Sequence, residues 1–207
     1  MGDCCDSDVD FSGVSDDYRR RLLAVIAING AMFFVEMVAG QLSGSQALKA
    51  DALDFLGDSL TYGASLWVIG RALRVRATVA FIKGLSLFAM GLWVLGSTAY
   101  RVFFVAVPEA EVMGLVALLA LAANVGSVLL LMRYREGDAN VRSVWLCSRN
   151  DAIGNVSVMV AALGVWGTAT GWPDLIVAGI MASLFLNSAT KILIQSRGEL
   201  RHAAEQG

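Results

Sequence analysis

The sequence predicts an all-α membrane protein with six transmembrane helices and both chain termini in the cytoplasm. Three observations predict it: an apolar composition, six apolar stretches of helical length, and basic residues confined to alternate connections. Of the 207 residues, 57% are apolar and 16% are charged, whereas a soluble domain has about 45–50% apolar and about 25% charged residues. The mean hydropathy is +0.63. This composition predicts a chain whose main partner is the lipid bilayer.

Six stretches are long enough to cross a bilayer core of about 30 Å, which needs about 20 helical residues. They cover 22–42, about 45–70, about 78–107, 112–132, about 139–168 and about 173–194. Polar residues interrupt the first stretch at Asn29, Glu36 and Gln41, whereas the fourth carries no charge.

Basic residues predict the orientation, since cytoplasmic connections are enriched in Lys and Arg. Arginines or lysines precede the first span, fill the connections after the second and fourth spans, and follow the sixth. The other three connections contain neither residue; they read GQLSGS, VPEAE and TATGWP. Both termini are therefore expected in the cytoplasm. We expect the protein to reside in a bacterial inner membrane.

The chain is expected to divide into a mobile acidic tail over 1–18 with Cys4 and Cys5, a transport domain over 19–197, and a short cytoplasmic tail over 198–207. No signal peptide is expected, because the N-terminus is acidic. The net charge of −2 argues against nucleic acid as a partner.

Carboxylates inside two spans are the informative signal, because an Asp at the centre of a membrane helix costs roughly 2.5–3.5 kcal/mol. Asp51, Asp54 and Asp58 share one stripe of the second span, with Asp54 and Asp58 about 40° apart. The fifth span carries Asp151, one turn after Cys147. Asp58 and Asp151 each lie twelve residues from the cytoplasmic end of their span, so both are roughly 18 Å deep.

Two antiparallel helices can therefore bring Asp54, Asp58, Cys147 and Asp151 together as a four-ligand metal site. Carboxylates with one thiolate suit Zn²⁺ or a softer ion such as Cd²⁺. Clustered carboxylates repel, so the empty site should hold protons that an incoming metal releases. This exchange predicts a metal/proton antiporter; metal is its substrate, and no cofactor is expected.

At these residues the sequence resembles the cation diffusion facilitator family. The stretch ALKADALDFLGDSLTYGASL looks like the family's second span, with Asp54 and Asp58 on its acid-or-His and Asp positions. The stretch SVWLCSRNDAIGNVSVMVAALG is similar to the fifth span, with Asp151 on the Asp position and Cys147 where His or Asp is usual. The resemblance covers about residues 15–197 and implies a homodimeric exporter, usually of Zn²⁺, that works by alternating access.

Three departures from the family pattern are expected to matter. Cys147 affects metal preference. We expect the protein to lack the cytoplasmic metal-sensing domain that family members carry after the sixth span, so dimerisation would rest on the spans. The histidine-rich loop of some members is also absent, because the connection there reads REGDANVR.

Several residues keep more than one interpretation. Asp51 can belong to the site, line its entrance or pair with Lys49. Cys147 can be an ordinary buried thiol, in which case Asn150, Asn155 or a water completes the shell. Cys4 and Cys5 can capture metal or form an incidental pair in a flexible tail.

Two other function classes stay open: a proton-coupled exporter of organic solutes, and a non-transporting membrane metal sensor. An enzyme is disfavoured, since the chain has a single histidine, His202, and no His-Glu-x-x-His motif.

Overall fold

The computed structural model describes residues 16–68, 73–104, 106–132 and 139–205. Side chains are described in these ranges except at 65, 68, 73, 76, 139–150, 202, 204 and 205. The described residues form six α-helices and no β-strand. They are α1 (Asp16–Ser43), α2 (Gln46–Val68), α3 (Leu73–Phe103), α4 (Ala110–Leu131), α5 (Ala139–Thr168) and α6 (Trp172–Glu205). The all-α prediction is confirmed.

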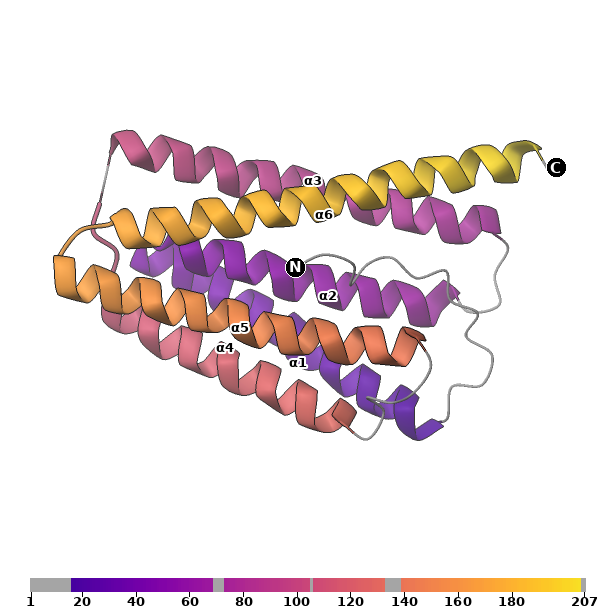
Figure 1. The fold of residues 1–207 in the computed structure, drawn as a ribbon, viewed down its shortest axis with the longest axis horizontal. Helices are drawn as coiled ribbons and strands as arrows, with labels where there is room; N and C mark the ends of the chain where they lie inside the picture. The colour runs from indigo at the N-terminus through magenta and orange to yellow at the C-terminus, as the bar shows by residue number, and fades with distance from the viewer. Residues whose placement is uncertain (1–15, 69–72, 105, 133–138, 206–207) are drawn as a thin grey trace.

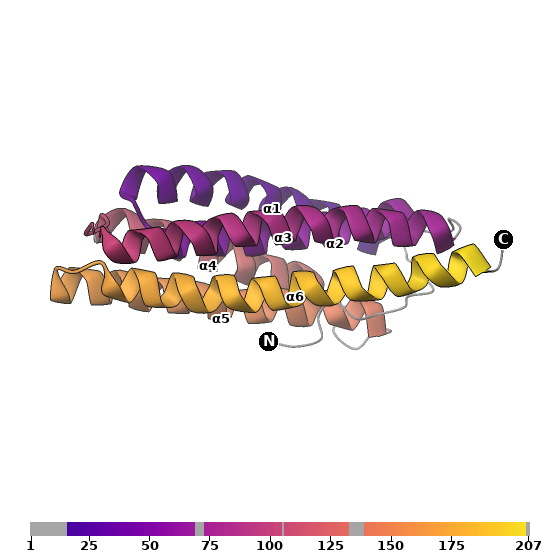
Figure 2. The ribbon, with the colours of Figure 1, turned by 90° about the horizontal axis from the view of Figure 1, so that it is seen from above.

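The six helices lie side by side along one long axis (Figure 1), and the view from above shows the same alignment (Figure 2). Helices α3 and α6 pack together along one side of the bundle, and α4 and α5 along another. Helix α2 contacts α1, α3, α5 and α6. The helix that carries three of the predicted site residues is therefore the most surrounded element.

Five described helices are long and apolar enough to cross a membrane: α1, α3, α4, α5 and α6. Helix α2 is not among them, because Lys49 and three aspartates fall within its 23 residues. The residues that predicted the site are thus the residues that lower its hydropathy. Six spans and cytoplasmic termini remain predictions.

Three helices extend five or more residues beyond the spans predicted for them; one of them, α3, begins at Leu73 instead of about residue 78. Helix α1 begins at Asp16 instead of residue 22, inside the segment predicted as a mobile tail. Asp16 and Asp17 favour this start, because negative charge stabilises a helix N-terminus, and Asp17 also pairs with Arg21 at 3.0 Å. Helix α6 continues to Glu205, past the predicted domain boundary at 197, because no proline interrupts it.

The outside of the bundle is apolar, as a lipid-facing surface requires. Large side chains stand exposed on α1, α3, α4, α5 and α6; examples are Phe34, Trp93, Leu115, Leu163 and Ile194. Exposure of apolar groups on this scale is unusual for a soluble monomer.

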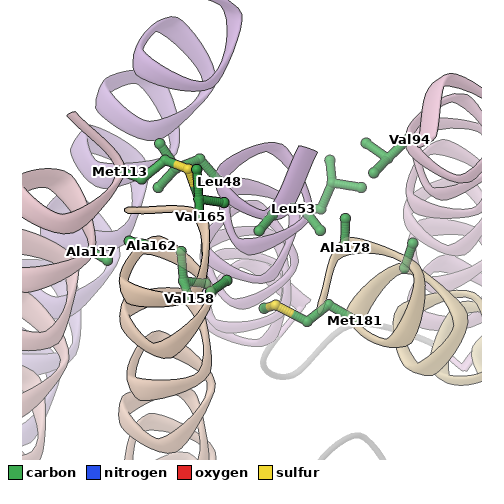
Figure 3. Close-up of a cluster of buried hydrophobic side chains, with 14 residues drawn as sticks. Leu48, Leu53, Val94, Met113, Ala117, Val158, Ala162, Val165, Ala178 and Met181 are labelled. Carbon is green, nitrogen blue, oxygen red and sulfur yellow. The ribbon is translucent and has the colours of Figure 1, made fainter. Parts of the chain in front are cut away.

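The core is built around α2 from side chains of modest size. Leu48 and Leu53 of α2 lie among Val158 and Val165 of α5 and Met181 of α6 (Figure 3). Met113 and Ala117 of α4 extend the same cluster. Alanines make up much of the rest, which lets the helices approach closely.

Glycine allows the closest approach between α3 and α6. A Cβ on Gly91 would lie 2.8 Å from Leu186 Cδ2, and one on Gly84 would lie 3.0 Å from Ile192 Cγ2. These distances are below normal contact, so a larger side chain would push the two helices apart.

Candidate functional site

Helices α2 and α5 bring three of the predicted site residues together. The carboxyl group of Asp151 lies within hydrogen-bonding reach of the carboxyl groups of Asp54 and Asp58. All three side chains are half-buried, so each keeps surface that an incoming ion can contact. The two helix segments that the depth argument paired therefore lie side by side, and their role as a metal site stays a prediction.

A tyrosine and a lysine lie beside Asp58. The hydroxyl of Tyr62, one turn later on α2, donates a hydrogen bond of 2.6 Å to Asp58 Oδ2. The ammonium group of Lys83 on α3 lies near enough for its charge to act on Asp58, and it donates to Thr61 Oγ1 at 3.2 Å. Sequence reasoning missed Tyr62, although its i+4 spacing from Asp58 was available as a signal.

Asp51 faces α1 instead of Lys49. Its carboxyl group lies opposite that of Glu36, and the two side chains are 1% and 0% exposed. Three of their carboxyl oxygens have no hydrogen-bond partner among the described residues: both oxygens of Glu36 and Oδ2 of Asp51. Lys49 instead lies near Asp174 and Arg101, with Nζ 5.9 Å from the centre of the Trp93 ring.

The Glu36–Asp51 pair adjoins the three-carboxylate group. The charge of Asp54 acts on both Glu36 and Asp51, so five acids from three helices lie in one region of the bundle. The sequence signal for Glu36 was its place as the lone acid of the first span, and that signal did not reveal which neighbour it faces.

Asn155 lies one turn after Asp151 on α5 and is fully buried. Neither atom of its amide group has a hydrogen-bond partner within the described part of the chain. The neighbouring Gly154 lies beside α2, since a Cβ there would be 4.0 Å from Asp51 Oδ1.

The remaining candidate residues cannot be placed as side chains. Cys147 and Asn150 belong to α5, but their side chains lie outside the described residues, and so do Cys4 and Cys5. Among the described His, Cys, Asp and Glu side chains, no three are arranged to hold a metal ion. The carboxylates are thus adjacent, but they do not form a finished coordination shell.

Ionised carboxylates as close together as Asp54, Asp58 and Asp151 repel one another strongly. Water does not screen the repulsion, because the effective dielectric constant inside a protein is low. The arrangement can be neutralised by protons or by a cation that the carboxylates share. Hydrogen bonds between facing carboxyl groups require a proton on one partner.

A further buried acid, Asp174 in the first turn of α6, has a different environment. It accepts hydrogen bonds from the Oγ of Ser45 and the backbone N–H groups of Gln46 and Ala47. Sequence reasoning missed it, because its partners are more than 120 residues away in the chain.

Known proteins resemble this chain over most of its length. A zinc transporter, ZitB, of Yersinia pestis is 30% identical over 210 residues, which is 92% of this chain and 65% of the relative. The metal cation efflux system protein CzcD of Cupriavidus metallidurans is 26% identical over 86% of this chain and 60% of the relative. A cadmium, cobalt and zinc/H⁺-K⁺ antiporter of Bacillus subtilis is 25% identical over 83% and 59%.

The chain therefore spans less than two thirds of the length of the relatives it matches. The family model for the cation efflux transmembrane domain matches residues 22–200, which contain the whole acid cluster and most of each candidate span. With five candidate spans and bacterial relatives, the protein is an integral protein of the bacterial inner membrane. The predicted family is confirmed: this chain belongs to the cation efflux, or cation diffusion facilitator, family.

Proposed function

We propose that this protein exports a divalent transition-metal cation from the cytoplasm in exchange for protons, and that Zn²⁺ is its main substrate. The observation that carries the proposal is the meeting of Asp54 and Asp58 of α2 with Asp151 of α5 inside an apolar bundle. Three carboxylates that face one another at such a place need a further cation or protons, beyond the single charge of Lys83 beside Asp58, and family membership supports a metal.

The exchange follows from the charge of the site. A divalent cation that binds Asp54, Asp58 and Asp151 displaces the protons which hold the empty cluster together. When the metal leaves on the other face, the same carboxylates take up protons again. Two conformations, one open to each face, then convert this competition into antiport.

Cys147 completes the site in this proposal. It lies on α5 one turn before Asp151, and its thiolate would be the fourth ligand. Three carboxylates and one thiolate favour Zn²⁺, and sulfur raises the affinity for Cd²⁺ relative to Mn²⁺. The names of two relatives support these metals: ZitB is a zinc transporter, and the Bacillus subtilis relative is an antiporter of cadmium, cobalt and zinc.

The proposed topology has six spans with both termini in the cytoplasm. Helix α2 crosses the membrane despite its charges, because α1, α3, α5 and α6 surround it and shield the aspartates from lipid. Three connections then lie at the outer face. They join α1 to α2 near Ser43, α3 to α4 near Glu109, and α5 to α6 near Gly171. We propose that two copies associate through their spans.

Flux measurement in proteoliposomes tests the function. Purified protein is reconstituted with an internal pH dye, and Zn²⁺, Cd²⁺, Co²⁺ and Mn²⁺ are supplied separately. Wild type should move Zn²⁺ with protons in the opposite direction, and Asp58→Asn should abolish both fluxes while the protein still inserts. Glu111→Gln, an exposed acid in the first turn of α4, is the matched control and should transport normally.

Two results separate the proposal from its alternatives. Metal flux without proton counter-movement would leave the metal site but remove the antiport. Normal flux by Asp58→Asn would remove the site, and proton flux driven by an organic solute with no metal dependence would indicate the organic-solute exporter. Deletion of residues 1–14 should leave transport intact, whereas a sensor built on Cys4 and Cys5 would lose its response.

A further inference from the structure

One side chain joins the N-terminus of α2 to α6. Asp174 accepts hydrogen bonds of 2.6 Å from Ser45 Oγ, 2.8 Å from the Gln46 N–H and 2.9 Å from the Ala47 N–H. Ser45 Oγ in turn accepts a hydrogen bond from the N–H of Leu48 at 3.1 Å. The free N–H groups in the first turn of α2 are thus satisfied by α6 and by Ser45, in the role that a helix cap plays.

The charge of Asp174 also suits this position. Helices α2 and α6 both begin here, so the carboxylate lies where the partial positive ends of two helix dipoles meet. Asp174 is 2% exposed, and Ser45 and Gln46 are 0% and 1% exposed. Water cannot replace these hydrogen bonds while the two helices stay together, so separating the helices breaks several at once.

Other contacts at the same end depend on this position of α2. The side-chain Oε1 of Gln46 accepts a hydrogen bond from Ser97 Oγ of α3 at 2.8 Å. Gly40 of α1 packs so closely that a Cβ there would lie 2.9 Å from Lys49 Cγ. The turn before α2 is also tight, because Gly44 adopts a φ of 79°, which favours glycine.

The bonded end of α2 is close to the acid cluster. Asp54 follows Gln46 by eight residues, which is about 12 Å along a helix. Along α2, the Asp174 contacts therefore lie about two helical turns from Asp54, at the end of the bundle where α2 and α6 begin.

We propose that Asp174 is a positioning residue that holds the outer ends of α2 and α6 together and so closes the acid cluster to the outer face. This inference rests on the proposed function, because alternating access requires that one end of the path be closed while the other is open. Release of metal to the outside then requires that the Asp174 hydrogen bonds break.

Sided labelling of a reporter thiol tests the inference without relying on transport. The three native cysteines are replaced by serine, and Gly154→Cys is introduced, since a Cβ there would have two neighbours within 4 Å among the described side chains, Met181 Cε at 3.9 Å and Asp51 Oδ1 at 4.0 Å. Sealed membrane vesicles of either orientation are treated with a membrane-impermeant methanethiosulfonate. Asp174→Ala should speed labelling from the outer face about tenfold, as expected when a charge-assisted hydrogen bond is lost from the closed state.

The control is Glu109→Ala. Glu109 lies at the same end as the N-cap of α4, and its side chain makes no capping hydrogen bond, so this change should leave both labelling rates unaltered. If Asp174→Ala fails to insert, Ser45→Ala removes one donor and should give a smaller increase in the same direction.

Two outcomes would overturn the inference: an unchanged outer rate in inserted Asp174→Ala protein, or an equal increase from both faces, which indicates general loosening. Because labelling requires no metal, failure of the flux assay would count against the proposed function and leave this result standing.

Discussion

Two groups of buried carboxylates in one bundle have opposite environments. Asp174 accepts three hydrogen bonds from donors of α2 and its preceding turn and lies where two helices begin. Asp54, Asp58 and Asp151 instead face one another, with Glu36 and Asp51 close by. An ionised acid surrounded by donors stabilises a fold, whereas acids that face acids are costly until a cation arrives. The comparison indicates which acids hold the fold and which serve the substrate.

The largest expected effect tests the substrate side of this comparison. Asp54→Asn keeps the size of the side chain but removes its charge, so Zn²⁺ flux should fall about 100-fold or more, the scale of a lost ligand. The melting temperature in detergent should stay the same or rise, because repulsion with Asp58 and Asp151 decreases. Flux and thermal unfolding are measured on one preparation. A variant that loses flux by unfolding would place Asp54 among the structural acids.

Asp174→Asn should show the reverse pattern in stability. The amide offers one uncharged acceptor oxygen in place of a carboxylate that serves three donors. The free energy of unfolding should fall by about 2 kcal/mol, as for a lost hydrogen bond to a charged group, and thermal unfolding in detergent measures it. Glu109→Gln, at the same end, should melt as wild type does. Equal melting of Asp174→Asn would show that the carboxylate contributes little.

Much of the fold and part of the candidate site could be predicted from the sequence. Apolar length predicts where the helices lie, and counting residues from the cytoplasmic ends predicts that Asp58 and Asp151 lie at one depth. The ends were less predictable: α1 begins in a segment whose acids indicated a tail, and α6 continues to Glu205. Charge and length predict the positions of the helices and the depth of their aspartates, because each of these is a property of one segment.

The rotation of each helix about its axis was not predictable, because packing sets it. Glu36 faces Asp51 as a result of the close approach of α1 to α2 at Gly40, and the periodicity of α1 alone does not reveal that neighbour. Asp174 was missed for a related reason, since its three partners belong to a turn and helix far away in the sequence. Contacts between two distant segments, such as these, can be found only once the fold is known.

Cys147→Ser should change metal preference more than overall transport. A serine hydroxyl is a harder and poorer ligand than a thiolate, so the preference for Cd²⁺ over Mn²⁺ should fall about tenfold. Competition between the two metals in the flux assay measures this ratio, and Cys4→Ser with Cys5→Ser is the matched control. An unchanged ratio would make Cys147 a packing residue and leave the fourth ligand to Asn150, Asn155 or a water.

The smallest expected effect concerns the one described hydroxyl that bonds an acid of the cluster. Tyr62→Phe removes the 2.6 Å hydrogen bond to Asp58 Oδ2 but keeps the ring, which is 3% exposed and packs with Leu22 and Val25. Asp58 loses a restraint worth about 1 kcal/mol, so KM for Zn²⁺ should rise about fivefold with little change in kcat. Tyr100→Phe, on the exposed face of α3, should alter neither constant. A fall in kcat with constant KM would mean that Tyr62 acts in the conformational change, and that the donor to Asp58 belongs with Asp174 on the structural side.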